Sequence, residues 1–288
     1  MTIIGTVDQL WRFPFKSMGG EQLDHCVVGT RGVVGDRAWA VRDEGAGEIR
    51  GAKKIPALLQ CTARFVEEPR EGLVPAVEIT LPDGECFRSD DADAARRLSS
   101  FLGRSVTVWP IQPATNLDHY QRGRPDSTDL MEELRQIFGR LPDEPLPDIS
   151  SFPPEVMRYA APPGTYFDLS PLHVLTTSSL RAVAARTPGA TVDVRRFRPN
   201  VLIEPTDKRE ALPESEWHGK RLRIGSVEAR IEMDTVRCVM PTLPQADLPK
   251  EPAILRTIVR EMGQGLGVYA SVVSPGSVRV GEAVELLY

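Results

Sequence analysis

The chain has 288 residues, of which 41% are apolar and 26% charged, a composition typical of a soluble globular protein with one large domain or two small ones. Its formal net charge of -5 at pH 7 gives no electrostatic support to general nucleic-acid binding or membrane-surface binding, so neither kind of partner is expected. The four cysteines lie far apart without a C-x-x-C pair, which argues against a disulfide scaffold and against zinc or iron–sulfur sites recognisable from spacing.

The N-terminus begins with Met1–Asp8, in which no basic stretch is followed by a long apolar run. This pattern predicts neither a signal peptide nor a membrane anchor. We therefore expect the protein to be cytoplasmic, in a reducing compartment where cysteines stay as free thiols.

Residues 1–112 are predicted to form a small N-terminal β-barrel or sandwich, because short β segments alternate there with glycine-containing turns. The expected strands are residues 2–10, 23–28, 34–42, 63–67, 76–81 and 105–109. One helix should interrupt them, with Asp90 as its N-cap and Gly103 as the residue that ends it.

Residues 113–165 are predicted to be a proline-rich connector with one helix. Apolar residues recur at helical spacing over residues 128–138, and Gly139 follows as a stop signal. Seven prolines then occur between Leu141 and Gly164, which excludes regular strand pairing over much of that span. We interpret the segment as an inter-domain connector that makes lid-like contacts over a site.

Residues 166–288 are predicted to form a second β-rich domain covered by helices. The expected strands are residues 166–175, 192–204, 222–224, 227–233 and 266–273, followed by a hairpin over 278–287. Helices are expected after Ser178, as an N-cap, and over residues 251–262. The predicted fold class is thus mainly β with a few helices (α+β).

The candidate for reactive chemistry is Cys238, which directly follows Arg237 where a strand gives way to a proline-containing loop. A neighbouring guanidinium favours the thiolate, which is both the nucleophilic and the metal-binding form of cysteine. The alternative is a small buried cysteine that happens to follow an arginine. His173, between two apolar residues, is predicted to be a core histidine rather than a base.

Recognition of an anionic ligand requires fixed cations near turns that expose backbone or hydroxyl donors. Three places offer them: the turn that carries Lys16 and Ser17, Arg37 after a Gly-Asp pair, and the run Arg195–Asn200. Each of these places could equally be a solvated surface charge. Arg198 is harder to dismiss, because a buried guanidinium before Pro-Asn needs a planar partner.

Five short motifs in order resemble the family with a molybdenum cofactor sulfurase C-terminal (MOSC) domain and its N-terminal β-barrel domain, which includes the amidoxime-reducing components. The motifs are Trp11–Ser17, Gly35–Trp39, Phe197–Asn200, Arg237–Cys238, and Val268–Ala270 together with Pro275–Gly281. The resemblance covers nearly the whole chain. It implies an N-terminal β-barrel domain over 1–112, a MOSC β-barrel over 166–288, and a cofactor cleft between them.

The resemblance also implies roles for individual residues around a molybdenum cofactor (Mo-molybdopterin). Cys238 matches the cysteine that coordinates molybdenum and is therefore both the metal ligand and the catalytic residue. The residues expected to bind the cofactor are Lys16, Ser17 and Arg37 in the first domain and Ser170, Arg198, Asn200, Arg237 and Tyr269 in the second. The chain departs from the family at Leu169, Val236 and the loop after Cys238, which bears on the substrate more than on the cofactor.

The resemblance implies an oxidoreductase that removes oxygen from a small N-hydroxylated substrate. The sequence contains no flavin, haem or iron–sulfur motif, so electrons would come from a separate donor protein. The alternative is a carrier, in which Cys238 holds a persulfide or the whole protein holds the cofactor for delivery to another enzyme. A third interpretation is an interaction module whose site has degenerated.

Overall fold

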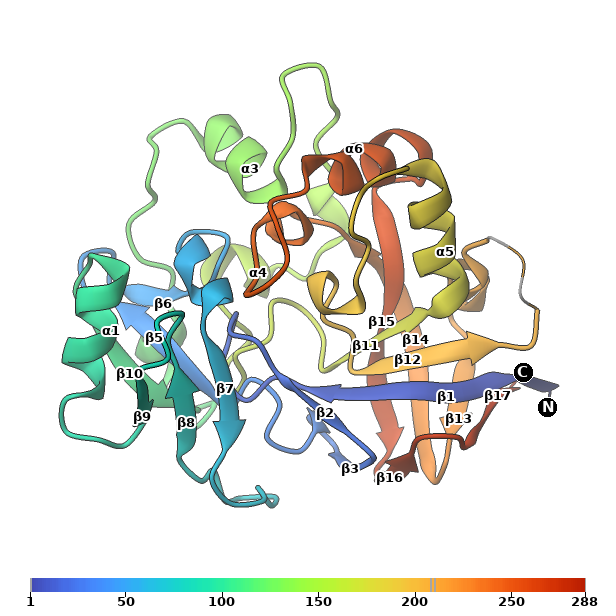
Figure 1. Ribbon diagram of the computed structural model, residues 1–288, viewed down its shortest axis with the longest axis horizontal. Coiled ribbons are helices and arrows are strands. Elements are labelled where there is room, and N and C mark those ends of the chain that lie inside the picture. Colours follow the sequence, from blue (N-terminus) through green and yellow to red (C-terminus); the bar gives the residue numbers. More distant parts are fainter. Residues whose placement is uncertain (1, 208, 210, 288) are drawn as a thin grey trace.

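The computed structural model describes residues 2–207, 209 and 211–287, and these form two β lobes joined by the connector (Figure 1). The larger lobe, at the right of Figure 1, is a closed barrel, and the smaller N-terminal lobe lies at the left. Strands dominate both lobes, and helices cover their outer faces. The predicted fold class, mainly β with a few helices, is confirmed.

The barrel consists of seven strands in the order β12-β11-β15-β14-β13-β17-β1, closed by pairing between β1 and β12. The strands are β1 (Thr2–Arg12), β11 (Leu172–Thr176), β12 (Val201–Pro205), β13 (Arg221–Ile224), β14 (Val227–Val236), β15 (Gly265–Ser274) and β17 (Ala283–Leu287). A short additional strand, β2 (Glu21–Leu23), also pairs with β1. Alternate side chains of β14 point into the interior core, as their period-two pattern predicts. Strand β1 stands at the start of the chain, directly before the N-terminal lobe, but it is part of the barrel. It therefore connects the two lobes.

The N-terminal lobe packs two three-stranded sheets and a helix around one core. The sheets are β10-β5-β6 and β7-β8-β9. Their strands are β5 (Trp39–Asp43), β6 (Glu48–Arg50), β7 (Thr62–Phe65), β8 (Val77–Thr80), β9 (Cys86–Arg88) and β10 (Val106–Pro110), and the helix is α1 (Ala94–Leu102). Leu98 of α1 is fully buried against this core with Phe15 and Val41. A third small sheet, β16-β3-β4, comprises β3 (His25–Gly29), β4 (Gly32–Val33) and β16 (Gly276–Arg279).

The connector passes over the region between the lobes. It contains α2 (Leu117–Tyr120), α3 (Leu130–Phe138), a 3₁₀ turn at Ile149–Ser151 and α4 (Glu155–Arg158). In Figure 1, α3 lies above this region, beside α6 (Pro252–Glu261) of the barrel lobe. The buried Glu144 anchors the connector to α6, because it accepts from Arg256 and, at 3.1 Å, from Arg260.

The glycine stop signals are confirmed, but both predicted N-caps are wrong. Gly103 and Gly139 end their helices in the left-handed region, with φ of 64° and 62°. Helix α1 begins only after Asp93, because residues 88–91 form a separate turn. Helix α5 (Thr177–Arg186) is capped by Thr176, whose hydroxyl accepts from the Ser179 amide, so Ser178 lies inside the helix.

Two predicted strands of the C-terminal part are shorter in the structure. Of residues 166–175 only those from Leu172 onward pair, because the preceding segment turns along the space between the lobes. Residues 192–204 contain a 3₁₀ turn at Val194–Arg196, and β12 starts at Val201. The unpaired segments place Asp168, Ser170 and Arg198 outside the sheet, where their side chains are free to form a site.

Candidate functional site

A cavity of about 450 Å³ lies between the two lobes and the connector. All nine residues predicted to form the site line it, although they come from distant parts of the chain. They are Lys16, Ser17, Arg37, Ser170, Arg198, Asn200, Arg237, Cys238 and Tyr269. Their individual roles stay predictions; the structure establishes that they lie around one space.

Three of these residues have strained backbones. Ser17, Arg37 and Arg198 have positive φ of 69°, 49° and 56°, in a described chain where only five non-glycine residues do. Such a conformation costs on the order of 1 kcal/mol for a residue with a Cβ, and it persists only where the surroundings fix it. The Ser17 hydroxyl, for example, accepts from the Ala52 amide at 2.8 Å. The strain is concentrated where the two lobes face the cavity.

Arg198 is a buried cation with unused hydrogen-bonding capacity. Its Nη1 donates to the Met18 carbonyl at 2.6 Å, and its guanidinium lies 4.0 Å from the centre of the Phe13 ring. Its Nη2 is buried and has no partner among the described residues. Burial, and secondarily the charge of Arg37, lowers the pKa of Arg198 to about 9. An anion in the cavity would satisfy both the donor and the charge.

Asn200 and Arg37 form a network with a buried aspartate. Arg37 pairs with Asp36, and the Asn200 amide nitrogen donates to the same carboxylate at 2.9 Å. The Asn200 Oδ1 accepts from the His173 amide at 3.1 Å. Since both ends of the Asn200 side chain bond within the protein, its observed task is to fix Asp36 and thereby orient Arg37.

The three arginines of the run Arg195–Arg198 lie in different environments. Arg195 is partly exposed and pairs with Asp193 and Asp247. Arg196 is fully buried and donates to the carbonyls of Pro241 and Pro249, at 3.2 and 2.8 Å, which fixes the loop after Cys238. Only Arg198 has a buried donor left for a ligand.

Cys238 follows the end of β14 and is half-buried, in contact with a small apolar cluster of Ala52, Leu59 and Met240. The adjacent Arg237 donates from Nη2 to the Phe197 carbonyl at 3.1 Å, whereas its buried Nε has no partner among the described residues. Burial lowers the pKa of Arg237, although the nearby Cys238, Tyr269 and Asp168 oppose the shift. The thiol is thus placed beside a second incompletely satisfied cation.

The connector fixes the cysteine loop from both sides. The Val239 amide donates to the Ile137 carbonyl at 3.1 Å, and the buried Arg140 donates from Nη2 to the Arg237 carbonyl at 3.2 Å. Arg140 also donates to the Gln264 side chain at 3.0 Å, while the Gln264 carbonyl accepts from the Arg237 amide at 2.9 Å. The end of α3 therefore positions the residues on either side of Cys238, which fits the expected lid-like contacts.

Sequence reasoning missed two charged residues at the centre of the site, Lys53 and Asp168. Asp168 accepts from Lys16 at 2.6 Å and from Lys53 at 2.8 Å, and 38% of its side-chain surface is open to solvent. Although burial opposes ionisation, the two lysines hold the pKa of Asp168 well below its usual range. Burial lowers the pKa of Lys16. Burial also opposes the charge of Lys53, but Asp168, Cys238 and Tyr269 together outweigh it and raise the pKa of Lys53.

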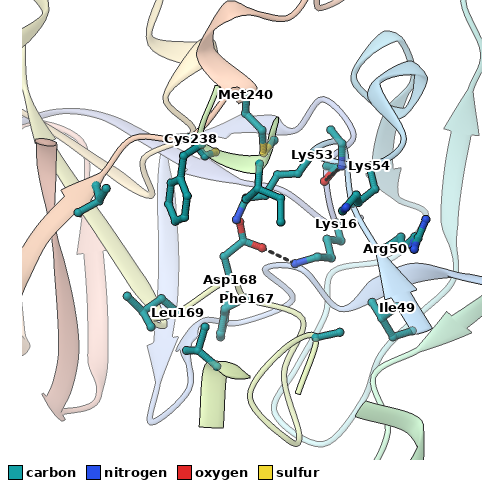
Figure 2. A pocket seen from close by; sticks show the side chains of 18 of the residues that line it. Lys16, Ile49, Arg50, Lys53, Lys54, Phe167, Asp168, Leu169, Cys238 and Met240 are labelled. Carbon is teal, nitrogen blue, oxygen red and sulfur yellow. Dashed lines mark hydrogen bonds and ion pairs between the residues drawn. The ribbon is translucent and has the colours of Figure 1, made fainter. Parts of the chain in front are cut away.

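Figure 2 shows Lys16 directed at Asp168, with Cys238 and Met240 lying together above this pair. No pattern in the sequence marks either missed residue, since Asp168 lies in a segment that reads as a strand.

Tyr269 and His173 form the wall of the cavity on the barrel side. Their rings lie 5.7 Å apart on the paired strands β15 and β11. Burial, and then Asp168, raises the pKa of Tyr269, so its phenol stays protonated at neutral pH. His173 is buried, as expected of a core histidine, but it also borders the cavity, and burial holds its pKa well below the usual value. Ser170 donates to the Ala270 carbonyl at 3.0 Å.

The cavity is strongly positive. Ten cationic side chains line it against three acidic ones, Glu48, Glu133 and Asp168. Cations that are buried without enough partners favour an anionic ligand, because binding restores the hydrogen bonds and charge balance that burial removed. Within the described ranges, no group of three or more His, Cys, Asp or Glu could hold a metal ion. A metal at Cys238 would therefore need further ligands from a bound cofactor.

No helix among the described residues is long and apolar enough to cross a membrane. The cytoplasmic location stays a prediction.

The chain is similar over nearly its whole length to known proteins. The model of the MOSC N-terminal beta barrel domain matches residues 4–107, and that of the MOSC domain matches residues 163–285. Mitochondrial amidoxime reducing component 2 of Macaca fascicularis is 30% identical over 299 residues, and that of Rattus norvegicus 28% identical over 305; each alignment covers 98% of this chain and 83% of the relative. The crystal structure of the YuaD protein from Bacillus subtilis matches with a TM-score of 0.47 and 11% identity, over 98% of this chain and 95% of that chain. The chain therefore belongs to the MOSC-domain family, in the form that carries the MOSC N-terminal β-barrel domain, as its sequence motifs indicated.

Proposed function

We propose that the protein binds a molybdenum cofactor between its lobes and reduces N-hydroxylated substrates with electrons from a separate donor protein. The observation that carries the proposal is that Arg198 and Arg237 line the same cavity as Cys238 and that each has a buried donor with no partner among the described residues. The relatives named amidoxime reducing components support the reaction class.

The residues present fit such a cofactor. Lys16, Arg37 and Arg198 would hold its phosphate and pterin, because they offer fixed cations and, at Arg198, an unused buried donor. Asp168 keeps Lys16 and Lys53 in place by accepting from both. Cys238 would be the protein ligand of the metal, since thiolate is a suitable ligand for a soft transition-metal centre.

When bound, the cofactor would supply two-electron redox chemistry at the metal. The contribution of this chain is placement and electrostatics. Arg237 is buried beside Cys238 and places a fixed positive charge next to the sulfur. Tyr269, whose pKa is raised by burial, keeps its phenolic proton and can donate a hydrogen bond to a ligand in the cavity. The connector, which bonds to the residues around Cys238, holds the cysteine loop in place.

Metal analysis tests the proposal. Protein made in a host that produces the cofactor should contain close to one molybdenum per chain, and Cys238→Ser should lose the metal or change its absorption spectrum. Cys86→Ser is the matched control, because Cys86 is exposed in the N-terminal lobe and does not line the cavity. Wild-type protein without molybdenum under these conditions would contradict the proposal.

An activity assay on the same molybdenum-loaded protein distinguishes an enzyme from a carrier. The enzyme should reduce benzamidoxime with an artificial electron donor such as reduced viologen. Protein that holds molybdenum but reduces no N-hydroxylated compound would point to a carrier of the cofactor or of a persulfide on Cys238. The half-buried position of that thiol at the cavity is compatible with either role.

A further inference from the structure

The cavity has a second wall of different chemistry, contributed by the connector. Its apolar side chains come from α3 and from the segment at residues 149–157. The main ones are Leu130, Leu134, Ile137, Phe152, Val156 and Met157. We call these six residues the apolar wall. None of them was identified as a site residue from the sequence.

The apolar wall adjoins Cys238. The carbonyl of Ile137 accepts from the amide of Val239, the residue directly after the cysteine, at 3.1 Å. Met240, which packs in the same apolar cluster as Cys238, lines the cavity as well. Figure 2 places Met240 next to Cys238, away from the charged pair of Lys16 and Asp168. A molecule that reached the sulfur would therefore meet cations on one side and hydrocarbon on the other.

The apolar face of α3 is only partly covered by the other described residues. An amphipathic helix ordinarily buries its apolar stripe in a core. On α3 the stripe is Leu130, Leu134 and Ile137, of which Leu134 and Ile137 are only half-buried and Leu130 is 55% exposed. Met157, on the facing segment, is 58% exposed. These side chains border the cavity instead of another protein element, so an apolar ligand would gain from covering them.

The helix that presents this face is firmly anchored by its polar side. Asp129 caps it by accepting from the Met131 amide at 2.8 Å. Glu133 pairs with Lys54 of the N-terminal lobe at 2.6 Å, and the Gly139 carbonyl accepts from Arg256 of α6. The uncovered face is thus held toward the cavity by contacts with both lobes.

We propose that the apolar wall binds the hydrocarbon body of the substrate, which is an uncharged N-hydroxylated compound with an alkyl or aryl group. The inference rests on the proposed function, because it takes the reacting centre to lie at Cys238. The ten cationic side chains that line the cavity, against three acidic ones, disfavour a cationic head group. The anionic cofactor of the proposed function would already balance these cations, so the head group is taken to be uncharged. The apolar wall would then determine which bodies fit.

A series of alkyl amidoximes of increasing chain length tests the inference on the molybdenum-loaded protein. In the assay the N–O bond breaks, two electrons come from reduced viologen and two protons from water, and the products are the amidine and one water molecule. We expect kcat/KM to rise about threefold for each methylene that the wall buries, until the chain outgrows the cavity. A flat response in the wild-type enzyme would overturn the inference.

Substitutions in the apolar wall test whether it causes the rise of kcat/KM with chain length. Leu134→Asn should reduce the gain per methylene to less than about twofold. Met157→Asn should act in the same direction; since that side chain is 58% exposed, the substitution leaves the fold intact. Met131→Asn is the matched control, because Met131 lies on the same helix, is 53% exposed and does not line the cavity. Equal slopes in all three variants and the wild type would contradict the assignment.

Binding of unreactive alkyl amides, measured by calorimetry, separates this inference from the proposed function. A protein that binds longer amides more tightly but reduces no amidoxime has the apolar site and lacks the proposed activity. A protein that reduces amidoximes while binding all amides equally has the activity, and the apolar wall does not recognise the substrate. The two failures therefore give different results.

Discussion

The two walls of the cavity differ in chemistry and in how the protein holds them. The cationic wall comes from turns and strand ends of both lobes, where Ser17, Arg37 and Arg198 have positive φ. Arg198 is 7% exposed and lacks a partner for one of its donors. The apolar wall comes from a helix and loops of the connector, with ordinary backbone angles at Leu134 and Met157 and side chains that are half-buried or exposed.

This difference indicates two kinds of occupant. Strain and unsatisfied buried donors are tolerated where a ligand stays bound and stabilises the folded protein. An apolar surface that is open to solvent suits a ligand that must enter and leave, because no fixed hydrogen bond has to be replaced at each exchange. Under the proposed function, the cationic wall would hold the resident cofactor and the apolar wall would bind the substrate that enters and leaves. Each prediction below alters one wall or its support.

The largest effect is expected for Arg198→Met. The variant should retain cofactor with affinity lower by on the order of 100-fold, about 2.7 kcal/mol, because charge-assisted hydrogen bonds to the anion are lost. Molybdenum content by mass spectrometry, and pterin content from its fluorescent oxidation product, measure the loss. Retention within a factor of three of the wild type would contradict the assigned role.

The stability of cofactor-free Arg198→Met sharpens this test. Burial lowers the pKa of Arg198, which means that the folded protein disfavours its charge. Removing the guanidinium relieves that cost while losing one hydrogen bond to the Met18 carbonyl. The unfolding free energy should therefore change by less than about 1 kcal/mol. Arg64→Met, at a side chain 70% exposed in the N-terminal lobe, is the control for both measurements.

Arg140→Met should weaken the support that the connector gives to the cysteine loop. Arg140 is 5% exposed, and it donates to the carbonyls of Phe138 and Arg237 and to the side chain of Gln264. Leaving these buried acceptors without donors should lower the unfolding free energy by about 2 kcal/mol. Urea denaturation measures the loss.

A second measurement distinguishes positioning from general destabilisation in Arg140→Met. Cys238 should react faster with a thiol reagent under native conditions, because its loop opens more often. Gln136→Ala, an exposed change on the neighbouring helix α3, should leave both the stability and the thiol reaction near wild type. An unchanged thiol reaction in Arg140→Met would show that Arg140 does not position the loop.

The sequence was sufficient to predict most residues of the cationic wall, but not Lys53 and Asp168 at its centre. Cys238, Arg198 and Lys16 stand in short motifs, so each could be assigned by its neighbours in the chain. Lys16 and Asp168, in contrast, are 152 positions apart and meet only because the segment before β11 turns between the lobes. No local pattern encodes such a contact, and Lys53 was missed for the same reason.

The connector shows a different limit. The helical spacing of its apolar residues and the stop at Gly139 predicted α3 closely, but not what its apolar face would border. That depends on anchors in both lobes, such as Lys54 and Arg256. Likewise the run Thr176–Ser179 offers four possible capping hydroxyls, and the tertiary placement of β11 selects Thr176. The type of each element could be predicted from the chemistry of its own residues. The residues that it contacts depend on tertiary packing and could not.

The unfolding free energy of the protein should depend on pH, because His173 is buried beside the cationic wall. Burial, with help from the charges of Arg237 and Arg37, holds the pKa of His173 well below its usual value. Below pH about 6.5 the unfolded chain binds a proton that the folded chain does not. The contribution of His173 to the unfolding free energy of the cofactor-free protein is therefore fully present above pH about 6.5. It is lost as the pH falls, by up to about 1.4 kcal/mol per pH unit.

The comparison of variants isolates this contribution. His173→Gln should show a shallower loss of unfolding free energy than the wild type between pH 7 and about pH 5.5. Urea denaturation at several pH values measures both slopes. His25→Gln, at an exposed position in β3, should keep the wild-type slope. Parallel slopes for wild type and His173→Gln would exclude this histidine as the source.

The smallest effect is expected for Glu133→Gln, which loosens the apolar wall at its anchor to the N-terminal lobe. Glu133 pairs with Lys54 at 2.6 Å, but Lys54 also pairs with Asp126 at 3.1 Å and so keeps a partner. The loss should be about 0.5 kcal/mol, which makes amide hydrogen exchange in α3 about twofold faster and leaves global stability nearly unchanged. Glu132→Gln, an exposed change on the same helix, is the control. If α3 exchanged at the wild-type rate in Glu133→Gln, its orientation would depend on its barrel-side contacts, which are those of Ile137 with Val239 and of Gly139 with Arg256. The part of the apolar wall on α3 would then be held by the barrel lobe and not by the N-terminal lobe.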